Sequence, residues 1–139
     1  GVPVGVNLQT GVETPIELPA LSGTPGRVEP AANGGQLWAV TQRDEAGMPT
    51  GHAIELVAAD GSVRSVVVNE NTAPILQFCV SPSGQYMAAI VAPDYANNPS
   101  DTYTRPMPKT VTRIVDVTDG SVISELNGFD VSWCSRSQL

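Results

Sequence analysis

The tetrapeptide Asp-Gly-Ser-Val occurs twice in this chain, at residues 60–63 and 119–122, and each copy separates two runs of mostly apolar residues. Glycine accepts the positive φ that a tight turn requires, so Asp-Gly between such runs is a strong signal for a β-hairpin. A similar hairpin is predicted at residues 7–18. The glycines of the three turns are spaced by 50 and 59 residues; they are Gly11, Gly61 and Gly120. Hairpins at such intervals predict a repeat protein made of β-strands.

A second element repeats between the hairpins. The stretch "AANGGQLWAV" at residues 31–40 matches "VSPSGQYMAA" at residues 80–89 through a shared Gly-Gln, 49 residues apart, that leads into an apolar strand. Its first half recurs at residues 129–137. One repeat therefore contains a strand, a turn, a strand, a loop, a strand, a glycine turn and a last strand. Four antiparallel strands in a repeat of this length are typical of a β-propeller blade.

The composition agrees with a β-rich globular chain. Of the 139 residues, 41% are hydrophobic, which is enough to bury a core. The 12 prolines and 13 glycines indicate many short elements joined by turns, with few helices. Fourteen acidic residues against seven basic ones give a net charge of −7, and no cationic stripe is available to neutralise a phosphate backbone. Nucleic acid is therefore not expected as a partner.

Two stretches resemble the repeats of a known family. "CVSPSGQYMAAI" resembles the Ser-Pro-Asp-Gly element of TolB-type and WD-repeat-like bacterial β-propellers, and "VDVTDGSVISEL" resembles the hairpin of the third and fourth strands in those repeats. Ser83 stands where the family usually has Asp. The resemblance implies an all-β fold built from propeller-type blades of four antiparallel strands.

The strand count predicts a partial propeller. We expect a partial blade at residues 1–26, blades at 27–73 and 74–128, and a partial blade at 129–139. About two full blades plus partial blades is fewer than the roughly 4 to 8 of closed propellers. The chain is thus predicted to be a single all-β unit that forms a segment of a larger propeller. A small β-sandwich made from the same hairpins is the alternative.

The two cysteines, Cys79 and Cys134, are predicted to form a disulfide. They fall at nearly equivalent positions in successive repeats, and an even count suits a mature, exported chain. Two separate buried thiols are the alternative. Trp38 and Trp133 are expected to pack in the core between repeats.

No catalytic, cofactor-binding or metal-binding residue is predicted. His52 is the single histidine, and no G-x-S-x-G elbow supplies a nucleophile for it to activate. Ser81 and Ser83 lie in a proline-containing turn and are predicted to be turn formers whose hydroxyls bond the local backbone. The acidic residues of the loop at 92–109 do not follow the spacing of a calcium-binding loop. The chain is accordingly not expected to be an enzyme or to carry a cofactor.

Partner binding is predicted at the loops of one end. In propeller topology the loop at 92–109 lies beside the loop at 43–51, and long loops on a rigid scaffold often carry function. Aromatic, arginine and methionine side chains are the types that anchor protein interfaces. The candidates for partner binding are Tyr95, Tyr103, Arg105, Met107 and Met48.

These features predict a non-enzymatic, extracytoplasmic propeller scaffold that binds another protein through its rim loops. Its expected location is periplasmic or at the cell surface, as a cell-envelope lipoprotein or an accessory subunit of a membrane complex, with membrane contact only through a partner or a removed lipid anchor. The alternative is the accessory propeller domain of a prolyl-oligopeptidase-like hydrolase whose catalytic domain is absent here. A sugar- or calcium-binding module is a third option.

Overall fold

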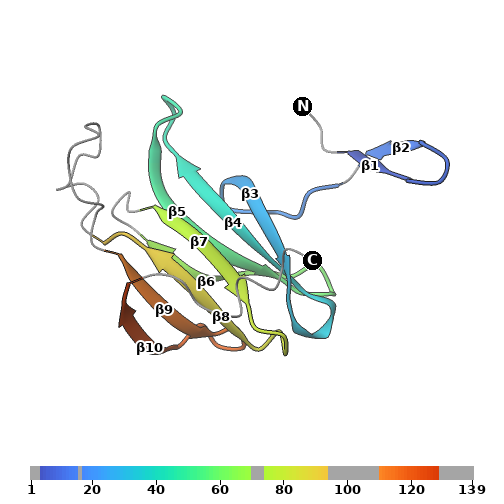
Figure 1. Ribbon diagram of the computed structural model, residues 1–139. Coiled ribbons are helices and arrows are strands. Elements are labelled where there is room, and N and C mark those ends of the chain that lie inside the picture. The colour runs from blue at the N-terminus through green and yellow to red at the C-terminus, as the bar shows by residue number, and fades with distance from the viewer. Residues whose placement is uncertain (1–3, 16, 70–73, 94–109, 129–139) are drawn as a thin grey trace.

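The computed structural model describes residues 4–15, 17–69, 74–93 and 110–128, which are strands and turns apart from one short 3-10 segment, η1 (Ala32–Gly34) (Figure 1). The strands are β1 (Val4–Val6), β2 (Glu13–Pro15), β3 (Thr24–Pro30), β4 (Gln36–Arg43), β5 (Pro49–Val57), β6 (Val63–Asn69), β7 (Ile75–Val80), β8 (Tyr86–Val91), β9 (Val111–Asp116) and β10 (Val122–Asn127). All of their pairings are antiparallel. The prediction of an all-β fold is confirmed.

The strands form three sheets. One is the two-stranded hairpin β1–β2, and the others are four-stranded, in the orders β3-β4-β5-β6 and β10-β9-β8-β7. Each four-stranded sheet pairs every strand with the next one along the chain, which is the strand arrangement predicted for one repeat. Figure 1 shows the β1–β2 hairpin extending away from both four-stranded sheets. None of the three sheets closes on itself within the described part of the chain.

The first and last hairpins share the same turn. The N–H of Asn7 donates to the carbonyl of Val12 at 3.0 Å, as the N–H of Asp116 donates to that of Ser121 at 2.9 Å. The glycine at the fifth position of each turn has positive φ, +69° in one and +78° in the other. Its N–H donates to the first residue of the turn in both cases. The β1–β2 hairpin thus has the local structure of β9–β10, although its own sheet has only two strands.

The turn between the first two strands of each four-stranded sheet corrects the predicted alignment. The left-handed glycines there are Gly34 and Gly84, both with φ +74°, whereas Gly35 has an ordinary φ of −77°. Aligned on these glycines, the repeat distance is 50 residues, one more than the shared Gly-Gln dipeptide indicates. With this correction Leu37 corresponds to Met87, and both side chains are fully buried. The left-handed backbone identifies equivalent positions in the two turns, because glycine accepts a left-handed φ at little cost.

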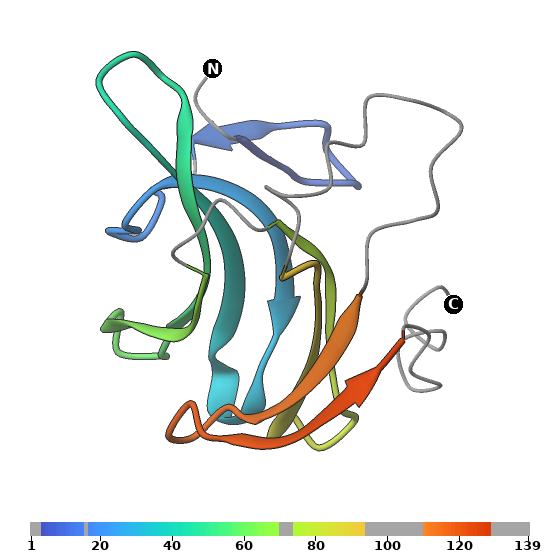
Figure 2. The same cartoon turned by 90° about the vertical axis from the view of Figure 1, so that its left-hand side faces the viewer.

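The two four-stranded sheets pack against each other, and their facing side chains form the core (Figure 2). Apolar residues from both sheets meet there, and each is less than a tenth exposed. The first sheet contributes Leu37, Ile54, Val66 and Val67, and the second sheet and its last turn contribute Phe78, Met87, Ala89, Val115 and Val117.

Trp38 does not occupy the core position that the sequence predicted. It is only partly buried, and its indole Nε1–H donates to the side-chain oxygen of Gln36 at 3.2 Å. Successive side chains of a strand point to opposite faces. Leu37 faces the neighbouring sheet, so Trp38 lies on the other face. Trp133 lies outside the described residues.

Candidate functional site

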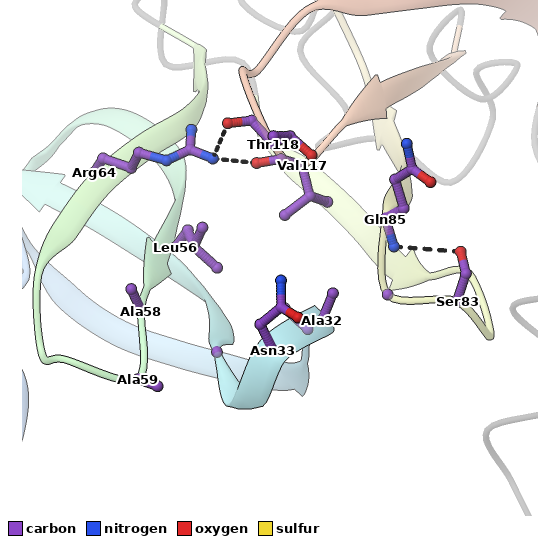
Figure 3. A pocket seen from close by; sticks show the side chains of 13 residues that line it. Ala32, Asn33, Leu56, Ala58, Ala59, Arg64, Ser83, Gln85, Val117 and Thr118 are labelled. Carbon is purple, nitrogen blue, oxygen red and sulfur yellow. Dashed lines mark hydrogen bonds between the residues drawn. The ribbon is translucent and has the colours of Figure 1, made fainter.

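A pocket lies between the two four-stranded sheets, at the end where their tight turns gather (Figure 3). The turns β3–β4, β5–β6, β7–β8 and β9–β10 all contribute to its lining, and its volume is about 460 Å³. Pockets that bind small molecules or cofactors typically have volumes of roughly 300 to 1,000 Å³. This end of the molecule therefore presents a hollow of binding size that both sheets build together.

Small residues keep this pocket open while holding the sheets together. Alanine and glycine residues make up much of its wall, with Leu56 and Val117 as larger apolar members. The N–H of Ala32 donates to the carbonyl of Gly84 at 3.3 Å and so joins the two sheets. A β-carbon added to Gly84 would lie 2.8 Å from the Ala32 Cα. Glycine is thus required at this point of contact.

Arg64 is the cation of the pocket, and it bridges the sheets. Its side chain projects from β6, and Nη2 donates to the carbonyl oxygens of Val117 and of Thr118, the latter at 2.7 Å (Figure 3). Nε and Nη1 make no hydrogen bond to the described residues. Hydrogen bonds from Ser121 lower the pKa of the Asp119 carboxyl below its usual value, and the Arg64 cation lowers it further. The guanidinium is therefore held in place through Nη2, and among the described residues no acceptor binds its other two nitrogens.

Asn33 faces the same pocket from η1. It has φ +56° and ψ +31°, and among the described residues it is the single non-glycine residue with positive φ. Its side chain rises from the turn into the space between the sheets (Figure 3) and makes no hydrogen bond to another described residue. Non-glycine residues held in sparsely populated backbone regions occur preferentially at functional sites. Asn33 is thus a second polar group available to a ligand.

The serines of the β7–β8 turn form the local hydrogen bonds that the sequence predicted. The Ser81 hydroxyl accepts the N–H of Tyr86 at 3.1 Å, and the Ser83 hydroxyl accepts the N–H of Gln85 at 3.3 Å. The two hydroxyls lie 3.0 Å apart. These contacts fix one wall of the pocket, and among the described residues no basic side chain forms a hydrogen bond to either serine.

The single histidine lies elsewhere. His52 is part of β5, where its Nδ1 lies 3.3 Å from the Thr41 hydroxyl. Burial lowers the pKa of His52 below its usual value, and the Arg43 cation adds to this effect. In the described ranges no three His, Cys, Asp or Glu side chains gather closely enough to hold a metal ion. Guanidinium, amide and hydroxyl groups therefore define the chemistry of the pocket, and these groups bind polar ligands.

Most of the partner-binding residues predicted from the sequence lie outside the described residues: Tyr95, Tyr103, Arg105 and Met107. Met48 is described, and it lies in the β4–β5 connection, at the opposite end of the strands from the pocket, with 62% of its surface exposed. Met48 therefore does not lie beside any of the pocket residues.

Cys79 is buried in β7 and is disulfide-bonded. Cys134 lies outside the described residues, so the predicted Cys79–Cys134 pair stays a prediction.

The pocket was not predicted from the sequence, although the sequence contains two signals for it. Asn33 precedes Gly34 in a turn dipeptide, and Arg64 interrupts the apolar run of β6. Neither signal shows that residues 31 positions apart share a cavity.

No protein-family model, curated protein or solved structure matches this chain. In the part of the chain that the structure describes, no helix has the length and apolar character needed to cross a membrane.

Proposed function

We propose that this chain is a segment of a β-propeller of the TolB or WD-repeat-like type, in which the two four-stranded sheets are consecutive blades. Several features support the proposal. The sheets share one strand order, and their left-handed turn glycines recur after 50 residues. Their first strands are neighbours, because Arg27 of β3 places its guanidinium 6.0 Å from the ring centre of Phe78 in β7. Such adjacency of first strands suits blades arranged around an axis.

In this proposal the chain is a non-enzymatic scaffold that binds another protein through the loops at the Met48 end, and it works outside the cytoplasm. The observation that carries the binding role is the β4–β5 turn. Its backbone is tied by mutual hydrogen bonds between Asp44 and Met48, at 3.0 Å and 2.8 Å, and Arg43 donates to the Gly47 carbonyl at 2.7 Å. An ordered turn that presents an exposed methionine resembles an interface anchor.

Site-specific photo-crosslinking tests this role. A photoreactive phenylalanine analogue replaces Met48 in the full-length protein, in the cells that produce it. Its matched control carries the analogue at Val122, an apolar residue of β10 with similar exposure, 55%. We expect a discrete crosslinked species from position 48 that is absent from position 122. In a second experiment the analogue replaces Thr50, and we expect its crosslink to the same partner to be lost when Gly47 and Met48 are both replaced by Asp. Absence of a crosslink at position 48, or the same products from both positions, would contradict the proposal.

A further inference from the structure

We propose that the pocket between the four turns binds a carboxylate carried by a peptide segment, with Arg64 and Asn33 as the recognising residues. This site lies at the opposite end of the strands from Met48, so it does not depend on partner binding by the loops. The carboxylate belongs either to a peptide C-terminus or to an acidic side chain, and both sources share the same chemistry.

Arg64 supplies the charge for this recognition. A guanidinium attracts a carboxylate through its charge and donates N–H groups to the carboxylate oxygens. Nη2 is held by two carbonyl oxygens of the neighbouring sheet, which fixes the plane of the group, whereas Nη1 makes no hydrogen bond to the described residues and can donate to one carboxylate oxygen. A donor held in place before binding avoids the entropy cost of ordering a flexible arginine.

Asn33 supplies hydrogen-bonding groups for the main chain of the bound peptide. Its side-chain amide has a donor and an acceptor side by side, as a peptide group does. The left-handed backbone places this amide in the pocket, where it has no partner among the described residues. The small residues around it, including Ala32 and Ala59, leave room for a main chain to approach.

The charges near the pocket favour a single carboxylate over a polyanion. Asp119 and Asp60 lie in two of the turns, and each accepts hydrogen bonds from a serine of its own turn, Ser121 and Ser62. Neither aspartate lines the pocket, and neither forms an ion pair with Arg64 among the described residues, although the Arg64 charge acts on Asp119 from a distance. Their charges repel a ligand with many negative groups, and such repulsion contributes to specificity.

The test uses three tripeptide probes and the amide NMR signals of the isotope-labelled protein. The probes are acetyl-Ala-Ala-Ala with a free carboxylate, the same peptide with a C-terminal amide, and acetyl-Ala-Asp-Ala-amide. We expect saturable shifts at Asn33, Gly84 and Thr118 with at least one carboxylate probe. If only the first or only the third probe binds, the source is a C-terminus or a side chain, respectively. Equal binding of the neutral peptide, or no saturable shift with any probe, would overturn the proposal.

Variants at Asn33 separate recognition from folding. Asn33→Gly removes the amide but suits the left-handed backbone, so we expect unchanged or higher thermal stability together with roughly tenfold or more weaker binding of the carboxylate probe. Asn33→Asp places a like charge at the same point and should abolish that binding. Leu76→Ala, at an exposed position of β7 outside the pocket lining, serves as the control and should bind like the parent protein. Unchanged affinity in both Asn33 variants would overturn the assignment.

Discussion

Gly84 and Gly47 share a backbone conformation but differ in surroundings. Comparing them separates the cost of a left-handed φ from the cost of a steric collision. Both have positive φ, +74° and +80°. A β-carbon on Gly47 would meet nothing within 4 Å, whereas one on Gly84 would collide with the backbone of Ala32 in the other sheet. Left-handed φ alone costs an L-residue about 1 to 2 kcal/mol. A collision with backbone adds to that cost, because neither sheet can shift independently of its core.

We predict that Gly84→Ala lowers the free energy of unfolding by roughly 1 to 3 kcal/mol more than Gly47→Ala does. Urea denaturation of the two variants and the parent measures the difference. Equal losses would mean that the two sheets do not approach each other at Gly84.

Single residues also show which sequence predictions were reliable. Ser81 and Ser83 were predicted correctly as turn formers, because their hydrogen bonds reach only a few residues along the chain. Trp38 was misplaced because its hydrophobicity says nothing about which face of the strand meets the neighbouring sheet. The left-handed Asn33 was not anticipated either, since glycine follows it and is the usual residue for that conformation.

At the scale of elements, the third strand of each four-stranded sheet carries a buried polar residue that fixes a neighbouring segment. Glu55 of β5 is 2% exposed, and its Oε2 accepts the N–H of Ser22, just before β3, at 3.0 Å. Thr112 of β9 is equally buried, and its hydroxyl donates to the carbonyl of Gly128, just after β10, at 2.7 Å. These contacts tie the chain segments that enter and leave the sheets.

We predict that Glu55→Ala destabilises the protein by about 1 to 3 kcal/mol, because the hydrogen bond to Ser22 is lost and a cavity remains. Glu55→Gln keeps an acceptor of the same shape and should cost less than about 1 kcal/mol. Chemical denaturation gives the stabilities, and amide hydrogen exchange at Ser22 reports the contact directly, with faster exchange expected in the alanine variant alone. Similar exchange in both variants would show that Glu55 does not hold this segment.

At the scale of the whole molecule, a Cys79–Cys134 disulfide would close a loop of 55 residues across the second sheet. On the chain-entropy account, such a crosslink stabilises the folded state by about 4 kcal/mol. We predict that reductant lowers the melting temperature of the parent protein, and that Cys79→Ser and Cys134→Ser both remove this dependence. Cys79→Ser also places a hydroxyl at a buried position, which lowers stability for a reason unrelated to the crosslink. Cys134→Ser is therefore measured beside it. A melting temperature that does not change on reduction would exclude the crosslink.

The sequence by itself determined the strands, the hairpin turns and the repeat of about 50 residues. These features depend on apolar patterning and on glycine φ, which act between residues close along the chain. Tertiary structure alone decided which faces of the strands are buried, where Gly84 meets Ala32, and that Arg64 reaches the turn at Thr118. The pocket belongs to this second group. Its four turns come together only because two sheets pack face to face, and that packing depends on side-chain shape across both surfaces rather than on any local motif.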